Sequence, residues 1–267
     1  MIWNTKSYDF MPKKYLGQNF LIEMNIINKI IDYINPKWKD NIVEIGPGYA
    51  ALTKPICKYV ELLNVIELDK NLVFFLENSW FRKKLNIFQS NAVHFNYLDI
   101  YNNGNKNIRI FGNLPYNISV ALILYLFNFL EIIEDMHFMV QKEVADRLSA
   151  IPGTKKYGRL SIIAQYYCDI FPLFSVDPIS FKPMPKVKSM FVKFIPNVKF
   201  PVCPQKIEVL EMITKEVFKH KRKMLRHSLS KFLTMENFIE LRINPMLRAE
   251  NLTIFQYFKL VHYLTLK

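Results

Sequence analysis

Short apolar runs and stretches of helical periodicity alternate along the first part of the chain. Apolar residues recur at helical spacing from Asn25 to Ile34, and Pro36 ends that pattern. Short apolar runs predict buried strands at residues 42–45, 62–66, 85–88, 108–111 and 136–140. Between these strands we expect helices at residues 52–59 and 119–129, with Ser119 as a capping residue, and after the last strand a helix at residues 142–148. This alternation predicts an α/β fold with a doubly wound, mainly parallel sheet.

The end of the chain follows a different pattern. Prolines and the lack of helical spacing indicate a linker between Pro196 and Pro204. Beyond it, residues 206–267 show helical spacing alone. We therefore expect two domains, an α/β domain over residues 1–200 and a small all-α domain over residues 201–267.

Composition adds a functional hint to this picture. The chain has 267 residues, of which 51% are apolar, so it is long and apolar enough for a packed core. Its formal net charge of +13 favours a polyanionic partner, either nucleic acid or an anionic membrane surface. A charge that serves solubility alone is the alternative.

Apolar segments and metal-binding residue types narrow the partners further. The most apolar stretch, residues 120–130, contains Asn128 and is too short to span a bilayer. The N-terminal residues lack the continuous apolar region of a signal peptide. The cysteines at positions 57, 168 and 203 and the five histidines show no metal-ligand spacing. We therefore expect a cytoplasmic protein that binds no metal and no membrane.

Two glycines directly follow the first predicted strand of the sheet. In doubly wound sheets ligands bind at the carboxyl ends of strands, and Gly46 and Gly48 let a ligand approach the backbone there. Glu67 ends the next strand, where its carboxylate can accept hydrogen bonds from both hydroxyls of a ribose. Together with Ala51, the glycines also satisfy the dinucleotide-binding fingerprint. A nicotinamide-dependent oxidoreductase and a plain strand-to-helix turn therefore both remain open at this point.

The tetrapeptide Asn113-Leu114-Pro115-Tyr116 follows the fourth predicted strand of the sheet. An exocyclic adenine amine is a poor nucleophile because its lone pair is delocalised into the ring. The side-chain oxygen of Asn113 and the carbonyl oxygen of Leu114 can accept hydrogen bonds from its two N–H groups and stabilise the positive charge of methyl transfer. Pro115 fixes the turn, and Tyr116 offers a ring on which a base can stack. The alternative is a strand-terminating turn without a catalytic role.

Taken together, these motifs resemble those of the ribosomal RNA adenine N6-dimethyltransferases, and closely those of the bacterial small-subunit type called KsgA. The similarity runs from about Lys14 to Tyr263, which is nearly the whole chain. Its ordered motifs are GQNFL (17–21), EIGPG (44–48), VIELD (65–69), FGNLPYNIS (111–119), QKEV (141–144), YGRLS (157–161) and FKPMPKV (181–187).

The resemblance implies a Rossmann-like class I methyltransferase sheet, mostly parallel with an antiparallel edge strand, and S-adenosylmethionine as the methyl donor. It implies dimethylation of the N6 amines of two adjacent adenines in a 3′-terminal hairpin loop of small-subunit (16S) ribosomal RNA, with a role in small-subunit biogenesis. The expected partner is this RNA in the immature 30S particle, and the chain is expected to be a monomer.

The resemblance also assigns roles to individual residues. Asn113 matches a residue that touches both cofactor and target amine, and Phe181 matches a second aromatic that sandwiches a flipped target base with Tyr116. For Phe181, a core aromatic at the entry to a strand is the alternative. The cofactor-binding positions are Asn19, Leu21, Gly46, Glu67, Asn91 and Asn113.

Asn91 departs from the family pattern. The family usually has aspartate at this position, and its carboxylate accepts a hydrogen bond from the adenine amine of the cofactor. Asparagine still accepts through its carbonyl oxygen, but without the charge-assisted part of the bond. We therefore expect cofactor binding weakened by about 1 kcal/mol, with activity retained.

Basic residues concentrate toward the end of the chain. Residues 181–231 contain thirteen Lys or Arg against three Glu. Such a face is expected to contact RNA phosphates without reading sequence, and a solvated helix face is the alternative. The residues of the predicted RNA-binding cluster, which lies on a predicted helix, are Lys221, Arg222, Lys223 and Arg226.

Two related functions remain as alternatives. One is a large-subunit ribosomal RNA adenine methyltransferase of the antibiotic-resistance type, although the basic tail and the motif at 181–183 are more similar to the small-subunit type. The other is a non-catalytic RNA-binding assembly factor, against which the intact tetrapeptide at 113–116 argues.

Overall fold

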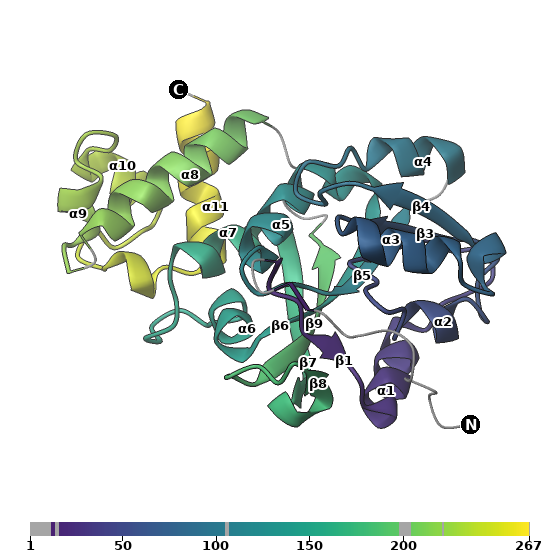
Figure 1. Cartoon of the computed structure of the whole chain (residues 1–267). Coiled ribbons are helices and arrows are strands. Elements are labelled where there is room, and N and C mark those ends of the chain that lie inside the picture. The colour runs from purple at the N-terminus through teal and green to yellow at the C-terminus, as the bar shows by residue number, and fades with distance from the viewer. Residues whose placement is uncertain (1–11, 14–15, 105–106, 198–203, 221, 267) are drawn as a thin grey trace.

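A seven-stranded sheet lies at the centre of the molecule, with a group of C-terminal helices to one side (Figure 1). The computed structural model describes residues 12–13, 16–104, 107–197, 204–220 and 222–266. The strands of the sheet are β2 (Asn41–Ile45), β3 (Leu63–Glu67), β4 (Leu85–Gln89), β5 (Ile108–Asn113), β6 (Ile133–Gln141), β7 (Cys168–Val176) and β9 (Ser189–Pro196).

The order of these strands is that of a doubly wound sheet. Across the sheet they follow the order β4-β3-β2-β5-β6-β9-β7. The strands from β4 to β6 run parallel, whereas β9 pairs antiparallel with both β6 and β7. The chain winds from β2 to the β4 edge and then returns to continue from β5 toward the other edge. The neighbours β2 and β5 therefore form the switch point, where ligands bind in folds of this kind.

Helices cover both faces of the sheet, because successive residues of its central strands point to opposite sides. Ile42 of β2 joins a hydrophobic cluster with residues of the helices Met24–Ile34 and Thr53–Ile56. Val43 joins another cluster with residues of the helices Ser119–Leu126 and Lys142–Leu148. The helices before residue 200 are α1 (Met24–Ile34), α2 (Thr53–Ile56), α3 (Lys70–Glu77), α4 (Leu98–Gly104), α5 (Ser119–Leu126), α6 (Lys142–Leu148) and α7 (Arg159–Tyr167).

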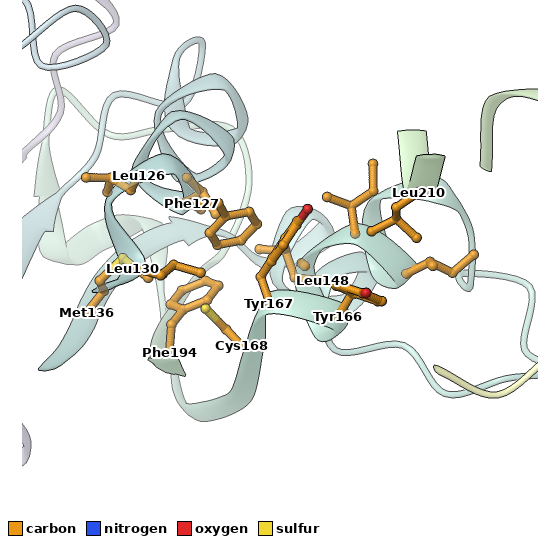
Figure 2. Packing of buried hydrophobic residues seen from close by; sticks show 14 of the residues in the cluster. Leu126, Phe127, Leu130, Met136, Leu148, Tyr166, Tyr167, Cys168, Phe194 and Leu210 are labelled. Carbon is orange, nitrogen blue, oxygen red and sulfur yellow. The ribbon is translucent and has the colours of Figure 1, made fainter. Parts of the chain in front are cut away.

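The C-terminal helices pack onto the rest of the molecule through the two tyrosines that end α7. The ring centroid of Tyr167 lies 5.3 Å from that of Phe127. Figure 2 shows Phe127 and Phe194 on one side of the tyrosine pair and Leu210 on the other. One hydrophobic cluster thus contains residues from the sheet and from the tail, so the two parts share a core across residue 200. The helices of the tail are α8 (Pro204–Lys219), α9 (Leu225–Ser228), α10 (Met235–Glu240) and α11 (Ile254–Thr265).

Two predicted helices are longer than those observed. The helix predicted at residues 52–59 ends at Ile56, and the chain continues to Tyr59 as turns. Pro55 lacks an N–H, and the N–H groups of Lys58 and Tyr59 bond three residues back, to Pro55 and Ile56. The helix predicted at residues 119–129 ends at Leu126 and gives way to a 3-10 helix, η3 (Phe127–Ile132).

The capping role predicted for Ser119 is wrong. The helix begins at Ser119 itself, and the residue at the cap is Ile118. The hydroxyl of Ser119 donates to the carbonyl of Tyr116 at 3.2 Å. It therefore ties the first turn of α5 to the preceding turn, which carries Tyr116.

The predicted linker is only partly described. Strand β9 ends at Pro196 and α8 begins at Pro204, while residues 198–203 lie outside the described residues. Within the described ranges, no helix combines the length and the apolar character needed to cross a bilayer.

Candidate cofactor and base-binding site

A pocket opens at the carboxyl ends of strands β2 to β5, beside the switch point of the sheet. Its walls come from the ends of these strands and from the segment before α1. Eight of the residues that the sequence singled out line it together: Asn19, Gly46, Gly48, Glu67, Asn91, Asn113, Leu114 and Pro115. The fold therefore brings together positions that are far apart in the chain.

Glu67 places a carboxylate in this pocket, and its residue is 6% exposed. Its Oε1 accepts a hydrogen bond from the N–H of Asp69 at 2.9 Å, and its Oε2 accepts one from the N–H of Gly48 at 3.3 Å. Burial raises the pKa of Glu67, while these backbone donors act in the opposite direction. The carboxylate is thus fixed at the end of β3, where ribose hydroxyls can donate to it.

Gly46 leaves room for a ligand beside the backbone. Its φ is +65°, a left-handed conformation that favours glycine. A Cβ at this position would meet no atom within 4 Å. The space next to Gly46 is therefore open, as a cofactor that passes close to the main chain requires.

Asn113 ends β5 with an oriented side chain. Its side-chain nitrogen donates to the backbone carbonyl of Asn19 at 2.7 Å, across 94 positions of the chain. Since the nitrogen donates to Asn19, the amide oxygen on the other side of the group is the atom that can accept a hydrogen bond from a bound amine. The N–H of Leu114 donates to the carbonyl of Met139 at 3.2 Å, which holds the turn against β6.

Gly112 allows β5 to lie close to β2 just before this turn. A Cβ on Gly112 would stand 2.4 Å from the backbone oxygen of Ile45, a distance that real Cβ atoms do not show. The absence of a side chain therefore sets the spacing between the strand that leads to Gly46 and the strand that ends at Asn113.

Tyr116 is anchored by a residue that no sequence pattern indicates. Its hydroxyl oxygen lies 2.6 Å from Oγ of Ser189 in β9, within hydrogen-bonding distance. Ser189 is fully buried and lies 73 positions away, so only the fold reveals the pair. Burial raises the pKa of Tyr116, and its bond to Ser189 acts in the opposite direction. The ring of Tyr116 thus has a fixed anchor at its outer end.

Phe181 lies in a two-stranded ribbon outside the main sheet. Strand β8 (Phe181–Lys182) pairs antiparallel with β1 (Phe20–Leu21), and Leu21 is the register partner of Phe181. These two residues are 4% and 3% exposed and belong to one hydrophobic cluster. Phe181 is therefore a core aromatic in this structure, and stacking on a base beside Tyr116 requires its ring to leave the cluster.

Asn91 lines the pocket just beyond the end of β4. Its side-chain oxygen accepts a hydrogen bond from the N–H of Val93 at 3.1 Å, in a turn that aspartate also forms. The single oxygen of Asn91 must therefore serve both this turn and a bound adenine amine. An aspartate would offer a second oxygen.

Comparison with known proteins decides between the open alternatives. Residues 10–266 match the family model described as ribosomal RNA adenine dimethylase. The chain belongs to this family. This match confirms the resemblance to the ribosomal RNA adenine N6-dimethyltransferases. The glycines after β2 are therefore assigned to a methyltransferase and not to a nicotinamide-dependent oxidoreductase.

Relatives with high identity cover nearly the whole dimethylase chain. Ribosomal RNA small subunit methyltransferase A of Buchnera aphidicola subsp. Acyrthosiphon pisum is 50% identical over 254 residues, which is 95% of this chain and 93% of the relative. The protein of the same name in Haemophilus ducreyi is 46% identical over 257 residues, covering 94% of this chain and 89% of the relative.

Two solved structures share the fold of this dimethylase. A dimethyladenosine transferase from Plasmodium falciparum superimposes with a TM-score of 0.79 at 23% identity, covering 90% of this chain and 95% of that one. The 23S rRNA methyltransferase ErmE gives a TM-score of 0.71 at 18% identity, covering 92% and 99%. The predicted class I methyltransferase fold is confirmed.

The segment before α1 is tied to the dimethylase pocket by Asp69. The Nζ of Lys13 lies 2.6 Å from Oδ1 of Asp69, and Nε2 of Gln18 donates to Oδ2 at 3.2 Å. Burial alone would raise the pKa of Asp69, but its hydrogen bonds, that from Lys13 first, lower it below the usual value. Asp69 lies in the VIELD motif and also accepts from the N–H of Asn71 at 3.0 Å. Its partners Lys13 and Gln18 come from more than 50 positions away, so no sequence pattern indicates this link.

Glu44 is a second buried carboxyl group, two residues before Gly46. It is 2% exposed and lies between its register partners Val65 of β3 and Phe111 of β5. Burial raises the pKa of Glu44 to about 8, and the nearby charge of Glu67 acts in the same direction. Glu44 is therefore mainly protonated at neutral pH.

Only part of the predicted RNA-binding cluster lies on a helix. Helix α8 ends at Lys219 and α9 begins at Leu225, so the exposed residues Arg222 and Lys223 belong to the connection between them. The connection is extended at Met224, which forms a bridge with Arg248, and this pairing prevents a continuous helix. Arg226 lies in α9, and Lys221 lies outside the described residues.

The described residues contain no cluster that could bind a metal ion, and their cysteines are buried. No group of three or more His, Cys, Asp or Glu side chains there is placed to hold a metal ion. Cys57 and Cys168 are buried and free, and burial raises the pKa of the Cys57 thiol to about 12. Cys203 lies outside the described residues.

Proposed function

We propose that this dimethylase transfers methyl groups from S-adenosylmethionine to the N6 amines of two adjacent adenines in a 3′-terminal hairpin loop of small-subunit ribosomal RNA. The observation that carries the proposal is the orientation of Asn113, whose nitrogen is bound to Asn19 and whose oxygen is left for the substrate. The amine acceptor lies in the same pocket as Glu67 and Gly46.

The pocket suits S-adenosylmethionine. Glu67 would accept hydrogen bonds from the ribose hydroxyls, the open space at Gly46 would take the methionine part, and Asn19 would contribute from the segment before α1. The other expected residue of this segment, Leu21, is buried in a hydrophobic cluster and does not line the pocket. When bound, S-adenosylmethionine supplies a methyl group on a positively charged sulfur. The pocket provides its placement next to the amine, which removes much of the entropic part of the barrier.

The residues of the clamp act on the target amine. The Asn113 oxygen and the Leu114 carbonyl accept hydrogen bonds from its two N–H groups, which draws the nitrogen lone pair out of conjugation and stabilises the developing charge. Tyr116, anchored on Ser189, holds the base by stacking. After transfer, the methylated nitrogen is acidic enough to lose its extra proton to water, so no side chain has to act as a base.

The assignment to the small subunit is supported by the relatives. Proteins named ribosomal RNA small subunit methyltransferase A are 43% to 52% identical to this chain over nearly its whole length. The 23S rRNA enzyme ErmE is far less similar in sequence, at 18% identity. We infer that the partner is the immature 30S particle, that residues 201–267 form the helical RNA-binding part, and that the enzyme acts as a cytoplasmic monomer during small-subunit biogenesis.

The test is methyl transfer from labelled S-adenosylmethionine to small subunits that lack the modification, followed by mapping of the modified bases. We expect dimethyladenine at two adjacent positions of the small-subunit RNA. Asn113→Ala is expected to lower the rate by about a hundredfold, with a much smaller loss of cofactor affinity. The matched control is Asn128→Ala, an exposed asparagine in η3 whose side chain donates to the carbonyl of Tyr125.

Two outcomes would contradict the proposal. Label that appears in large-subunit RNA and not in small subunits would assign the enzyme to the antibiotic-resistance type. A chain that binds cofactor and particles but transfers no methyl group would be the non-catalytic assembly factor.

A further inference from the structure

Both tryptophans that the structure describes are exposed on the same side of the molecule. Trp80 is 74% exposed, Trp38 is 53% exposed, and Tyr59 is 51% exposed. Tryptophan is highly buried on average, so two exposed indoles on one surface indicate a surface that binds a partner. We call this surface, formed by residues 37–39, 54–62 and 80–84, the basic aromatic surface.

The basic aromatic surface lies at the end of the sheet opposite to the pocket. Trp38 precedes β2, and Trp80 precedes β4, so both lie near the amino ends of parallel strands. The pocket with Asn113 and Glu67 lies at the carboxyl ends of these strands. The basic aromatic surface is therefore separate from the site that binds cofactor and base.

Contacts around α2 join the two indoles into one surface. The Nζ of Lys54 lies 5.8 Å from the ring centroid of Trp80, and the Nζ of Lys84 lies 5.0 Å from that of Trp38. Lys84 also donates to the carbonyls of Cys57 and Val60, which fixes it at the end of α2. The surface thus runs from Trp80 across α2 to Trp38.

Positive charge surrounds these rings. The residues 37–39, 54–62 and 80–84 contain one acidic residue, Glu61. Against it stand seven basic residues: Lys37, Lys39, Lys54, Lys58, Arg82, Lys83 and Lys84. Exposed aromatic rings among lysines are the combination that binds single-stranded nucleic acid, since the rings stack on bases and the charges contact phosphates.

We propose that the basic aromatic surface binds an unpaired segment of ribosomal RNA, with bases stacked on Trp80 and Trp38 and phosphates next to the surrounding lysines. The proposal rests on the proposed function for the choice of ribosomal RNA. It adds a second RNA contact, far from the base that is methylated. The T-shaped contact of Trp80 with the buried ring of Phe81, at 5.3 Å, gives the exposed indole a fixed support.

Tryptophan fluorescence tests this surface directly. The chain has three tryptophans, and Trp3→Phe leaves Trp38 and Trp80 as the only reporters. Addition of single-stranded polyuridylate is expected to quench their emission, because stacked bases quench an indole. The quenching should weaken as salt concentration rises. Unchanged emission at low salt would overturn the proposal.

Variants of Trp80 extend the test to the natural particle. Trp80→Ala is expected to lower affinity for undermethylated small subunits about tenfold, or about 1.4 kcal/mol, and Trp80→Phe to restore most of it. The matched control is Phe171→Ala, which removes a half-exposed aromatic from β7 at the opposite edge of the sheet and should have no effect. Cofactor affinity should stay unchanged in all three variants.

The outcomes separate this proposal from the proposed function. Trp80→Ala that weakens particle binding while polyuridylate leaves the fluorescence unchanged would assign the surface to a protein partner and overturn the RNA contact. If Trp80→Ala binds particles like the unmodified chain, the proposal is also wrong. A dimethylase that is quenched by polyuridylate but methylates no small subunit would support this surface and contradict the proposed function alone.

Discussion

Two asparagines of the pocket use their amides in opposite ways. Asn113 commits its nitrogen to Asn19, so its oxygen is available to a substrate amine, whereas Asn91 commits its only oxygen to Val93. Sequence position predicts that both residues lie at strand ends beside the ligand. It does not predict their orientation, because the partner of Asn113 is a main-chain atom that only the fold brings near.

Asn91→Asp is the sharpest test at a single residue. We expect S-adenosylmethionine to bind about fivefold more tightly, by about 1 kcal/mol, because aspartate can serve the Val93 turn with one oxygen and the adenine amine with the other. Calorimetric titration measures the change. Asn244→Asp is the control, because Asn244 makes the same kind of turn with Met246 far from the pocket. Equal affinities of Asn91→Asp and the parent chain would contradict this account.

The apolar pattern of the sequence predicts some strands of the structure and misses others. The central strands are apolar runs buried on both faces, so their positions were predicted within a few residues. Strand β7 was not predicted, because it is an edge strand with an irregular burial pattern and a break in register between Pro172 and Phe174. The strands β1 and β8 have only two residues each, too few to show any period.

Gly112 offers a test of how closely two elements must pack. Gly112→Ala is expected to lower the free energy of unfolding by about 1–3 kcal/mol, because the new Cβ would collide with the backbone of Ile45. Urea unfolding measures the loss. Gly158→Ala is the control, since a Cβ there meets nothing within 4 Å and its backbone is extended. Equal losses for the two variants would show that the β2–β5 spacing is not the cause.

At the scale of the whole molecule, charge was predictable and the shared core was not. Net charge and the density of lysines are properties of composition, whereas the cluster around Tyr166 and Tyr167 joins segments on both sides of residue 200. Strands end and helices alone follow near the expected division at residue 200. The hydrophobic core, however, contains residues from both sides of this position.

The basic cluster at residues 221–223 gives a prediction for RNA affinity. Replacing Lys221, Arg222 and Lys223 by glutamine is expected to weaken binding to small subunits. The slope of log affinity against log salt should become shallower by about 2–3, because fewer counterions are released. Cofactor affinity should not change. An unaltered slope in binding titrations would show that these residues form a solvated surface only.

Glu44 makes the stability of the whole molecule depend on pH. The folded chain keeps this proton up to a pKa of about 8, whereas the ordinary value is 4.5. The contribution of Glu44 to the free energy of unfolding is therefore complete below pH 4.5 and is lost as the pH rises through 8. His137 has the opposite effect on stability, because burial lowers its pKa from the ordinary 6.5 to about 4. The free energy of unfolding therefore falls as the pH drops below 6.5. The effect of Glu44 is thus clearest above pH 6.5.

We expect the free energy of unfolding to fall by about 1.5 kcal/mol between pH 6.5 and 8, and Glu44→Gln to remove this fall. Denaturant titrations at a series of pH values measure it. Glu143→Gln, at an exposed position of α6, is the control and should keep the fall. Parallel pH curves for Glu44→Gln and the parent chain would be inconsistent with a buried, protonated Glu44.

The core shared by sheet and tail has a geometric consequence under the proposed function. Because α8 packs against α7 in one hydrophobic cluster, we expect the turn with Arg222 and Lys223 to keep a nearly constant distance from Asn113. The base-binding site and the basic turn are then two RNA contacts at a set spacing. A target adenine is selected by its separation in space from a run of phosphates elsewhere in the folded RNA. Short isolated hairpins, which can reach only one of the two contacts, should be poor substrates.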